Sequence, residues 1–109
     1  MGRIVITCYR PRVADPAAAA ALLAVVREHV PALQQLGLAT LRAPVLMQAT
    51  DGSLLEVFEW ASADAVARAH VHPVVQALWQ RFDTVCEHAT LASLAETAGL
   101  FAEFTPIDD

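Results

Sequence analysis

The segment Leu54–Trp60 (LLEVFEW) decides which fold we expect, because both of its faces are apolar. It is short and rich in branched and aromatic residues, which is typical of a β-strand. Alternate side chains of a strand point to opposite faces. One face carries Leu55 and Val57, and the other carries Leu54, Glu56, Phe58 and Trp60. Helices can cover only one face, so we expect the other to be buried against the sheet of a second copy of the chain.

Two further strands are predicted around this segment, and a fourth near the end of the chain. The turn at residues 50–53 (TDGS) contains Asp-Gly, which between two strand-like runs is typical of a hairpin. It separates Leu54–Trp60 from the run Leu38–Ala49, and we expect the two to be antiparallel. The β-branched run Arg3–Tyr9 (RIVITCY) predicts a first strand, and Phe101–Thr105 a last one.

A long helix is predicted between the first two strands. Asp15 suits its N-cap, and Pro16 suits its first position, where the missing N–H does no harm. Apolar residues recur with a period of 3.6, and Gly37 is expected to end the helix. Pro31 is expected to kink or split it.

A second helical region is predicted after Trp60, interrupted at the stretch Ala69–Pro73 (AHVHP). Ser62 is the expected N-cap of its first part. Pro73 cannot continue that helix but can begin the next, so we expect this stretch to be a joint. The resulting order is β-α-β-β-α-β. It indicates a single α+β domain over residues 1–109, with a ferredoxin-like antiparallel sheet and helices on one face.

Composition narrows the class of protein. A chain of 109 residues accommodates one core, not a substrate domain beside a cofactor domain. Because 56% of its residues are apolar and 17% charged, a monomer of this size would leave much apolar surface exposed, which again favours a homodimer. The net charge of −5 supplies no basic surface, so we expect no nucleic-acid partner and no binding to anionic membranes.

The sequence also indicates the cellular compartment. The most apolar run, Ala17 to Val26, is shorter than the ~20 residues of a membrane-spanning helix, and the first residues do not resemble a signal peptide. Cys8 and Cys86 form no CxxC pair and suit a reduced compartment better than a disulfide framework. We therefore expect a cytoplasmic protein.

Three runs carry a resemblance to a known family: Glu56–Ser62 (EVFEWAS), Ala69-His70, and His72–Trp79 (HPVVQALW). They resemble the antibiotic-biosynthesis-monooxygenase-like group of the dimeric α/β-barrel superfamily. The resemblance implies that two ferredoxin-like protomers pair sheet to sheet into a barrel. That superfamily contains cofactor-independent monooxygenases of polyaromatic substrates, haem-degrading enzymes and stress-response dimers, so membership alone does not select a reaction.

Haem degradation is disfavoured at the residues that would carry it. That branch places an Asn in the first strand, a Trp in the helix after the Trp-x-Ser strand end, and a His ten residues later. The matching positions here are Thr7, Ala69 and Trp79, and none has the required side chain. Cofactor-free oxygenation of an activated aromatic molecule needs less: a dry cavity, a base for a phenolic proton, and donors for the resulting anion.

His70 is the candidate catalytic residue for that chemistry. It ends a helix whose buried face should look into the gap beside the sheet, and an imidazole can accept a phenolic proton near neutral pH. A hydrogen-bonded structural histidine is the alternative reading. The candidate residues for binding a small aromatic or apolar molecule are Trp60, Trp79, Phe82 and Glu56. The two tryptophans also suit a core, and Glu56 also suits an ion pair with Arg42.

No metal or cofactor is expected. His70 and His72 would point about 200° apart on a helix, and no third ligand stands at a recognisable spacing. Cys86 and His88, two positions apart on an expected helix, would not face each other as a thiol dyad. Two classes of function remain open: a cofactor-independent monooxygenase, or a non-enzymatic homodimer that binds a ligand or acts in a stress response. A cavity large enough for a ring system, into which the His70 imidazole points, would favour the first, and a gap filled by Trp79 and Phe82 would favour the second.

Overall fold

The computed structural model describes residues 1–107, so Asp108 and Asp109 of the expected domain lie outside the described residues. Its five strands are β1 (Arg3–Pro11), β2 (Val45–Gln48), β3 (Leu54–Trp60), β4 (Cys86–Ala89) and β5 (Thr105–Pro106). The helices are α1 (Pro16–Gln35), α2 (Ala63–His70) and α3 (Pro73–Val85), and two 3₁₀ turns, η1 (Leu91–Ser93) and η2 (Ala95–Ala98), follow β4. The strands form one antiparallel sheet in the order β4-β1-β3-β2-β5.

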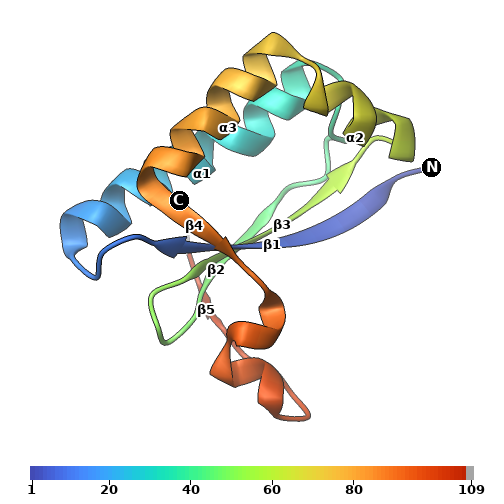
Figure 1. Ribbon diagram of the computed structural model, residues 1–109. Helices are drawn as coiled ribbons and strands as arrows, with labels where there is room; N and C mark the ends of the chain where they lie inside the picture. The colour runs from blue at the N-terminus through green and yellow to red at the C-terminus, as the bar shows by residue number, and fades with distance from the viewer. Residues whose placement is uncertain (108–109) are drawn as a thin grey trace.

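All three α-helices lie on one face of this sheet (Figure 1). The α+β class with an antiparallel sheet is therefore confirmed, and the strand order is compatible with a ferredoxin-like fold. The core between the layers takes Leu54, Phe58 and Trp60 from β3, and packs them against the buried faces of α1, α2 and α3. The Leu55 and Val57 side of β3 consequently faces away from the helices.

Local signals in the sequence place most of the helix ends correctly. The side chain of Asp15 accepts a hydrogen bond from the Ala18 N–H at 2.7 Å, and that of Ser62 accepts one from the Ala65 N–H at 3.0 Å. In the turn between β2 and β3, Gly52 has a φ of +91°, which few other residues adopt readily. The Asp-Gly hairpin is confirmed by the pairing of Gln48 with Leu54.

The expected joint at Ala69–Pro73 is also confirmed. Helix α2 ends at His70 and α3 begins at Pro73. The Nδ1 atom of His72 accepts a hydrogen bond from the Val74 N–H at 3.2 Å, so this side chain is the N-cap of α3. Its role in the structure is therefore to begin a helix.

The sequence left a kink or a split open at Pro31. The structure excludes the split, because α1 runs unbroken from Pro16 to Gln35. Proline removes the hydrogen bond to the carbonyl of Arg27, one turn earlier. Pro31 lies on the exposed side of α1, so the buried side of the helix still packs on the sheet.

Three expected strand or helix boundaries also need correction. Residues 86–89 were expected to continue a helix but form β4, because the free edge of β1 pairs with them from Cys8 to Pro11. The run Leu38–Ala49 is a strand only over Val45–Gln48, although Ala39 makes an isolated bridge to Trp60. Phe101–Thr105 is irregular until Thr105, where the two-residue β5 pairs with β2.

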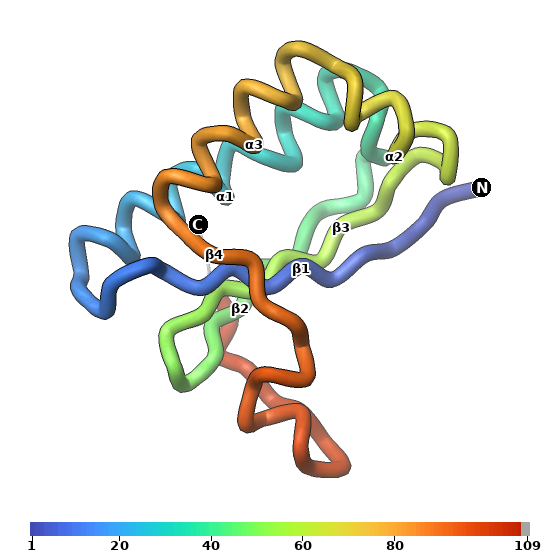
Figure 2. The backbone as a smooth tube through the Cα atoms, viewed as in Figure 1, coloured from blue at the N-terminus to red at the C-terminus, as the bar shows by residue number. Residues whose placement is uncertain are grey.

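The chain after β4 crosses to the face of the sheet opposite the helices (Figure 2). There it covers part of that face, packing against Cys8, Leu55 and Ala49. The uncovered part exposes apolar side chains: Ile4 is 60% exposed, Ile6 48% and Val45 51%. We call this open area the outer face.

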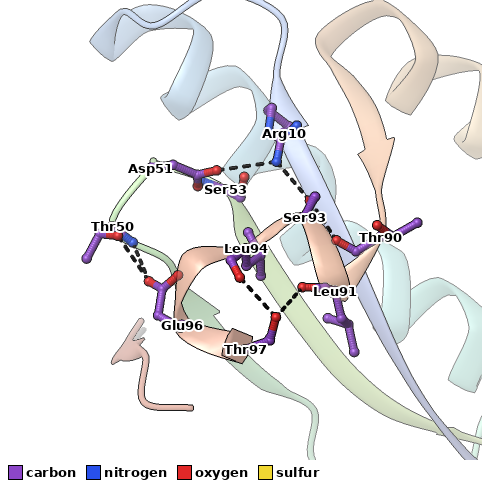
Figure 3. Close-up of polar contacts among 10 residues, drawn as sticks. All are labelled: Arg10, Thr50, Asp51, Ser53, Thr90, Leu91, Ser93, Leu94, Glu96 and Thr97. Atoms are coloured by element: carbon purple, nitrogen blue, oxygen red, sulfur yellow. Dashed lines mark hydrogen bonds and ion pairs between the residues drawn. The ribbon is translucent and has the colours of Figure 1, made fainter. Parts of the chain in front are cut away.

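Polar contacts tie the segment after β4 to β1 and to the hairpin turn (Figure 3). The guanidinium of Arg10 donates to Ser93 Oγ at 3.0 Å and pairs with Asp51 at 3.4 Å. The carboxylate of Glu96 accepts hydrogen bonds from the N–H and the hydroxyl of Thr50, at 2.8 and 3.2 Å. These contacts hold the two 3₁₀ turns against the sheet and leave the outer face open.

Helix α1 is long and apolar enough, by length and composition alone, to cross a membrane. The most apolar run of the sequence, Ala17 to Val26, is only part of this helix, which extends from Pro16 to Gln35. In this fold α1 packs one face on the sheet, through Leu22, Val26 and Leu33. Core helices of soluble proteins share that composition.

Candidate functional site

A cavity of about 440 Å³ lies between the helices and the β1 and β3 strands. This volume is within the ordinary range for small-molecule sites in proteins. We call it the sheet–helix cavity. Its lining comes from every layer of the fold: Val5, Thr7, Tyr9, His29, Phe58, Trp60, His70, Gln76, Trp79, Gln80, Phe82, Asp83 and His88.

The walls of the sheet–helix cavity are mainly aromatic. Phe58 and Trp60 project from β3 and meet at a ring distance of 5.1 Å. Phe82, from α3, stacks on the Tyr9 ring at 4.7 Å. Trp79 lies one turn earlier on α3 and is partly buried between the two main apolar clusters. Three of the residues expected to bind a small molecule, Trp60, Trp79 and Phe82, thus line the same cavity.

A chain of hydrogen bonds runs beneath these walls and joins four side chains from four elements. The Tyr9 hydroxyl donates to Glu56 Oε1 at 2.8 Å. The same oxygen lies 2.8 Å from His29 Nδ1, and His29 Nε2 lies 3.1 Å from Trp79 Nε1. His29 is 4% exposed and Glu56 is 0% exposed. The sheet and both long helices are thus linked through a buried polar group.

The donors in this hydrogen-bond network indicate which atoms of its side chains carry the protons. An indole nitrogen can only donate, so Trp79 requires a lone pair on His29 Nε2. The proton of a neutral imidazole is then on Nδ1, which donates to Glu56 Oε1. Glu56 accepts from both His29 and Tyr9, which is the role of a carboxylate. The structure therefore contains a His–Glu pair in which the carboxylate orients the imidazole, as in many acid–base sites.

Tyr9 remains protonated in this arrangement. Burial, and then the adjacent carboxylate of Glu56, hold the pKa of its phenol far above the ordinary value of 10.0. Its hydroxyl therefore serves as a permanent donor to Glu56. The second oxygen of that carboxylate, Oε2, is buried and has no hydrogen-bond partner.

The expected ion pair between Glu56 and Arg42 is wrong. Arg42 instead pairs with Glu59 at 3.2 Å, and the carboxylate of Glu59 also accepts from the Thr40 hydroxyl. Glu56 and Glu59 lie on opposite faces of β3 because they are three residues apart on a strand. Glu56 is also not part of the cavity surface, and its link to the cavity is through His29 and Tyr9.

His70, the candidate catalytic residue, lines the sheet–helix cavity from the end of α2. Its side chain is exposed, and its ring meets the edge of Trp79 at 5.0 Å. Its backbone carbonyl accepts a hydrogen bond from the side-chain amide of Gln76. His70 therefore lines the cavity where the cavity meets solvent.

Two of the central residues were not singled out from the sequence. In the sequence, His29 is one residue within the expected long helix, and Tyr9 is the last residue of the expected first strand. A signal for His29 existed: its neighbours at helical spacing, Val25, Val26 and Leu33, place it on the buried face of α1. A histidine on such a face needs a polar partner.

Cys86 and His88 also differ from expectation. They lie on β4, where positions two apart share a face. His88 lines the sheet–helix cavity and its ring lies 5.3 Å from that of Tyr9, whereas Cys86 is buried among apolar residues. Within residues 1–107, no group of three or more His, Cys, Asp or Glu side chains is placed to hold a metal ion.

A larger hollow, of about 870 Å³, lies on the outer surface between α1 and α3. Its polar side chains, such as Arg27, Glu28 and Arg81, are exposed, and Arg81 and Glu28 pair with each other at 2.6 Å. Since this outer hollow contains no buried polar group, we place the functional site in the sheet–helix cavity.

Comparisons with known protein families, with curated proteins and with solved structures find no match for the chain.

Proposed function

We propose that the protein is a homodimeric, cofactor-independent monooxygenase that binds a small hydroxylated aromatic molecule in the sheet–helix cavity. The observation that carries this proposal is an aromatic cavity of about 440 Å³ built over a buried His29–Glu56–Tyr9 network. Apolar walls with a few polar groups are the usual composition of a small-molecule site. The resemblance of residues 54–82 to the antibiotic-biosynthesis-monooxygenase-like group agrees with this activity.

Flat ligands suit the walls of the cavity. Phe58, Trp60 and Trp79 present rings from the sheet and from α3, and such rings pack with other rings in stacked or edge-to-face geometry. The polar groups on the surface include three imidazoles, those of His29, His70 and His88. An aromatic molecule with a hydroxyl group matches both properties.

The proposed reaction needs dioxygen as the only co-reactant. An imidazole of the cavity accepts the proton of the substrate hydroxyl, which makes the ring electron-rich. Dioxygen then adds to a ring carbon that carries hydrogen. One oxygen atom becomes a new carbonyl and the hydroxyl becomes a second, while the other oxygen atom leaves as water with the two hydrogens. The substrate supplies all four electrons, and the product is a quinone.

The outer face supports the homodimer. Ile4, Ile6 and Val45 are about half exposed or more in one chain, and they lie together on the sheet side that no helix covers. Pairing of two outer faces would bury them and place the two sheets back to back, as in a dimeric barrel.

Oxygen consumption tests the proposed reaction. We would incubate the protein with hydroxylated naphthalenes and anthracenes, record dioxygen uptake, and identify quinones by mass spectrometry. The expected result is uptake of one dioxygen per quinone formed. In His29→Gln, the rate of uptake should fall at least tenfold, which corresponds to about 1.4 kcal/mol in activation free energy. Quinone formation at the rate of a protein-free control would contradict the proposal.

A non-enzymatic ligand-binding dimer is the second candidate, and one observation favours it. Both imidazole nitrogens of His29 are already paired, with Glu56 and with Trp79, so no buried imidazole among the described residues is free in this conformation. Such a protein would bind the same aromatic compounds without consuming dioxygen. Binding measured by tryptophan fluorescence, together with an absence of turnover, would establish this candidate over the first.

A further inference from the structure

We infer that His29, rather than His70, accepts the hydroxyl proton of the ligand, and that the Trp79 indole occupies the accepting nitrogen until the ligand displaces it. This inference rests on the proposed binding of a hydroxylated aromatic molecule. It assigns His29 as the catalytic base, Glu56 and Tyr9 as positioning residues, and Trp79 as a gate.

The geometry around the imidazole of His29 leaves one atom for this role. Its Nδ1 is held by Glu56 at 2.8 Å, while its Nε2 carries the lone pair and meets the indole N–H of Trp79 at 3.1 Å. His29 is almost fully buried yet forms part of the cavity surface. A ligand in the cavity therefore meets this imidazole on the side where Trp79 now donates.

A ligand hydroxyl can replace the indole because the two groups are donors of the same kind. A phenolic O–H is the more acidic donor. Hydrogen bonds donated by O–H groups are also shorter than those donated by N–H groups to the same acceptor. Trp79 is only partly buried and lies on the cavity wall, so the core does not enclose its ring on every side. After the exchange, the hydroxyl of the ligand lies against His29 Nε2.

Proton transfer from that hydroxyl is balanced within the site. The O–H bond of the ligand breaks and an N–H bond forms at His29 Nε2, giving an oxyanion and an imidazolium. The imidazolium keeps its Nδ1–H on the Glu56 carboxylate, whose Oε1 also accepts from Tyr9. The total charge is unchanged, and the new positive charge lies between two negative groups. A buried carboxylate beside the base is what stabilises this state.

The other bases around the cavity have no such support. His70 and His88 are exposed, and their side-chain contacts are with aromatic rings: Trp79 for His70, and Tyr9 and Phe82 for His88. Asp83 is exposed too. Within residues 1–107, neither the His70 nor the His88 imidazole has a carboxylate hydrogen-bonded to it as His29 has.

A pair of ligands that differ only in the hydroxyl tests the inference. We would measure the affinities of 2-naphthol and of its methyl ether, and take their ratio as the hydroxyl preference. Trp79→Phe removes the indole N–H but keeps an aromatic wall, so the preference should rise by about tenfold, the value of one hydrogen bond to an uncapped acceptor. Trp60→Phe is the matched control, since Trp60 lines the same cavity and makes neither a hydrogen bond nor a ring contact with His29, and it should leave the ratio unchanged.

Nitrogen-15 NMR of the histidine rings gives a readout that is independent of affinity and of any folding defect in a variant. In the free wild-type protein, His29 should be the neutral Nδ1–H tautomer. Saturating 2-naphthol should convert Nε2 to a protonated or strongly hydrogen-bonded nitrogen, and the methyl ether should not. His70 should change little with either compound.

The outcomes separate the inference from the function on which it rests. Binding of both compounds with an equal ratio in wild type, Trp79→Phe and Trp60→Phe would overturn the role of His29, while the aromatic site would stand. A response at the His70 nitrogens instead of those of His29 would do the same. If neither compound binds to the wild-type protein, the proposed function itself fails.

Discussion

His29 on α1 and Glu56 on β3 are joined by a hydrogen bond of 2.8 Å between Nδ1 and Oε1, although 27 residues separate them in the chain. Both side chains are buried, and the remaining polar atoms of the network come from Tyr9 and Trp79. A buried carboxylate is costly unless it accepts hydrogen bonds. The pair therefore links the position of the helix layer to that of the sheet at the place where the cavity forms.

Loss of the Tyr9 hydroxyl should destabilise the protein. Tyr9→Phe keeps the ring and its stacking on Phe82 but removes one of the two donors to Glu56. We expect the free energy of unfolding to fall by about 1–3 kcal/mol, because the acceptor is charged and buried. Urea unfolding followed by circular dichroism measures this. A loss below about 0.5 kcal/mol would show that the hydroxyl is not needed to keep Glu56 buried.

A charge on the outer face should prevent dimer formation. Ile6→Asp places a carboxylate in the middle of that face, where an unpaired buried charge would cost several kcal/mol, on the order of the whole stability of such an interface. We expect sedimentation velocity to give a dimer for the wild type and a folded monomer for the variant. Val13→Asp is the control, since Val13 is as exposed but lies in the loop before α1. A wild-type monomer at micromolar concentration would remove the homodimer from the proposed function.

The two histidines of the joint should respond differently to alanine substitution. His72→Ala removes the N-cap of α3 and should lower the free energy of unfolding by about 1 kcal/mol, with ligand affinity unchanged. His70→Ala should have little effect on stability, because the side chain is exposed. It should weaken ligand binding moderately, through the lost contact with Trp79. His72→Asn should restore the cap, and failure to do so would argue against capping as the role of His72.

Cys86 should be unreactive in the folded protein. Burial raises the pKa of its thiol to about 11, so at pH 8 only about a thousandth of it is the reactive thiolate. Burial also raises the pKa of Cys8. We expect iodoacetamide to label neither cysteine at pH 8 and both in 6 M urea, on the order of the concentration that unfolds small domains. Labelling of the folded protein within minutes would contradict the packing described for β4.

The contact between Glu96 and the hairpin turn should weaken at low pH. The hydrogen bond from the Thr50 N–H holds the pKa of Glu96 below its ordinary value of 4.5. A carboxyl group whose pKa is lowered in the folded state stabilises that state at higher pH, and the contribution is lost as the pH falls through the folded value. The amide proton shift of Thr50 should therefore titrate with a midpoint below 4.5. Glu96→Gln should remove this titration, and a midpoint at or above the ordinary value would contradict the contact.

Features that depend on a few neighbouring residues were predictable. Asp15 and Ser62 cap the helices that follow them, Gly52 allows the hairpin turn, and Pro73 separates α2 from α3. Each is decided within about four residues by backbone geometry and a side chain in reach of it. The order of the elements from β1 to α3, and with it the α+β class, follows from such local signals.

Features that depend on pairing between distant segments were not predictable in the same way. Residues 86–89 continue a helical pattern but become β4, because the edge of β1 offers them backbone partners. Pro31 remains within α1, because packing on the sheet outweighs one lost hydrogen bond. In both places tertiary contacts override a local preference.

The sequence by itself determined the order of the elements from β1 to α3, the apolar character of both faces of Leu54–Trp60, and three of the aromatic residues that line the cavity, Trp60, Trp79 and Phe82. Only the tertiary structure decided which face of β3 the helices cover, and that Glu56 meets His29 and Tyr9 instead of Arg42. The physical reason is that a strand alternates its side chains with a fixed period, whereas the partner of a buried charge depends on which helix packs above it. That partner lies 27 residues away, at a distance that no local pattern encodes.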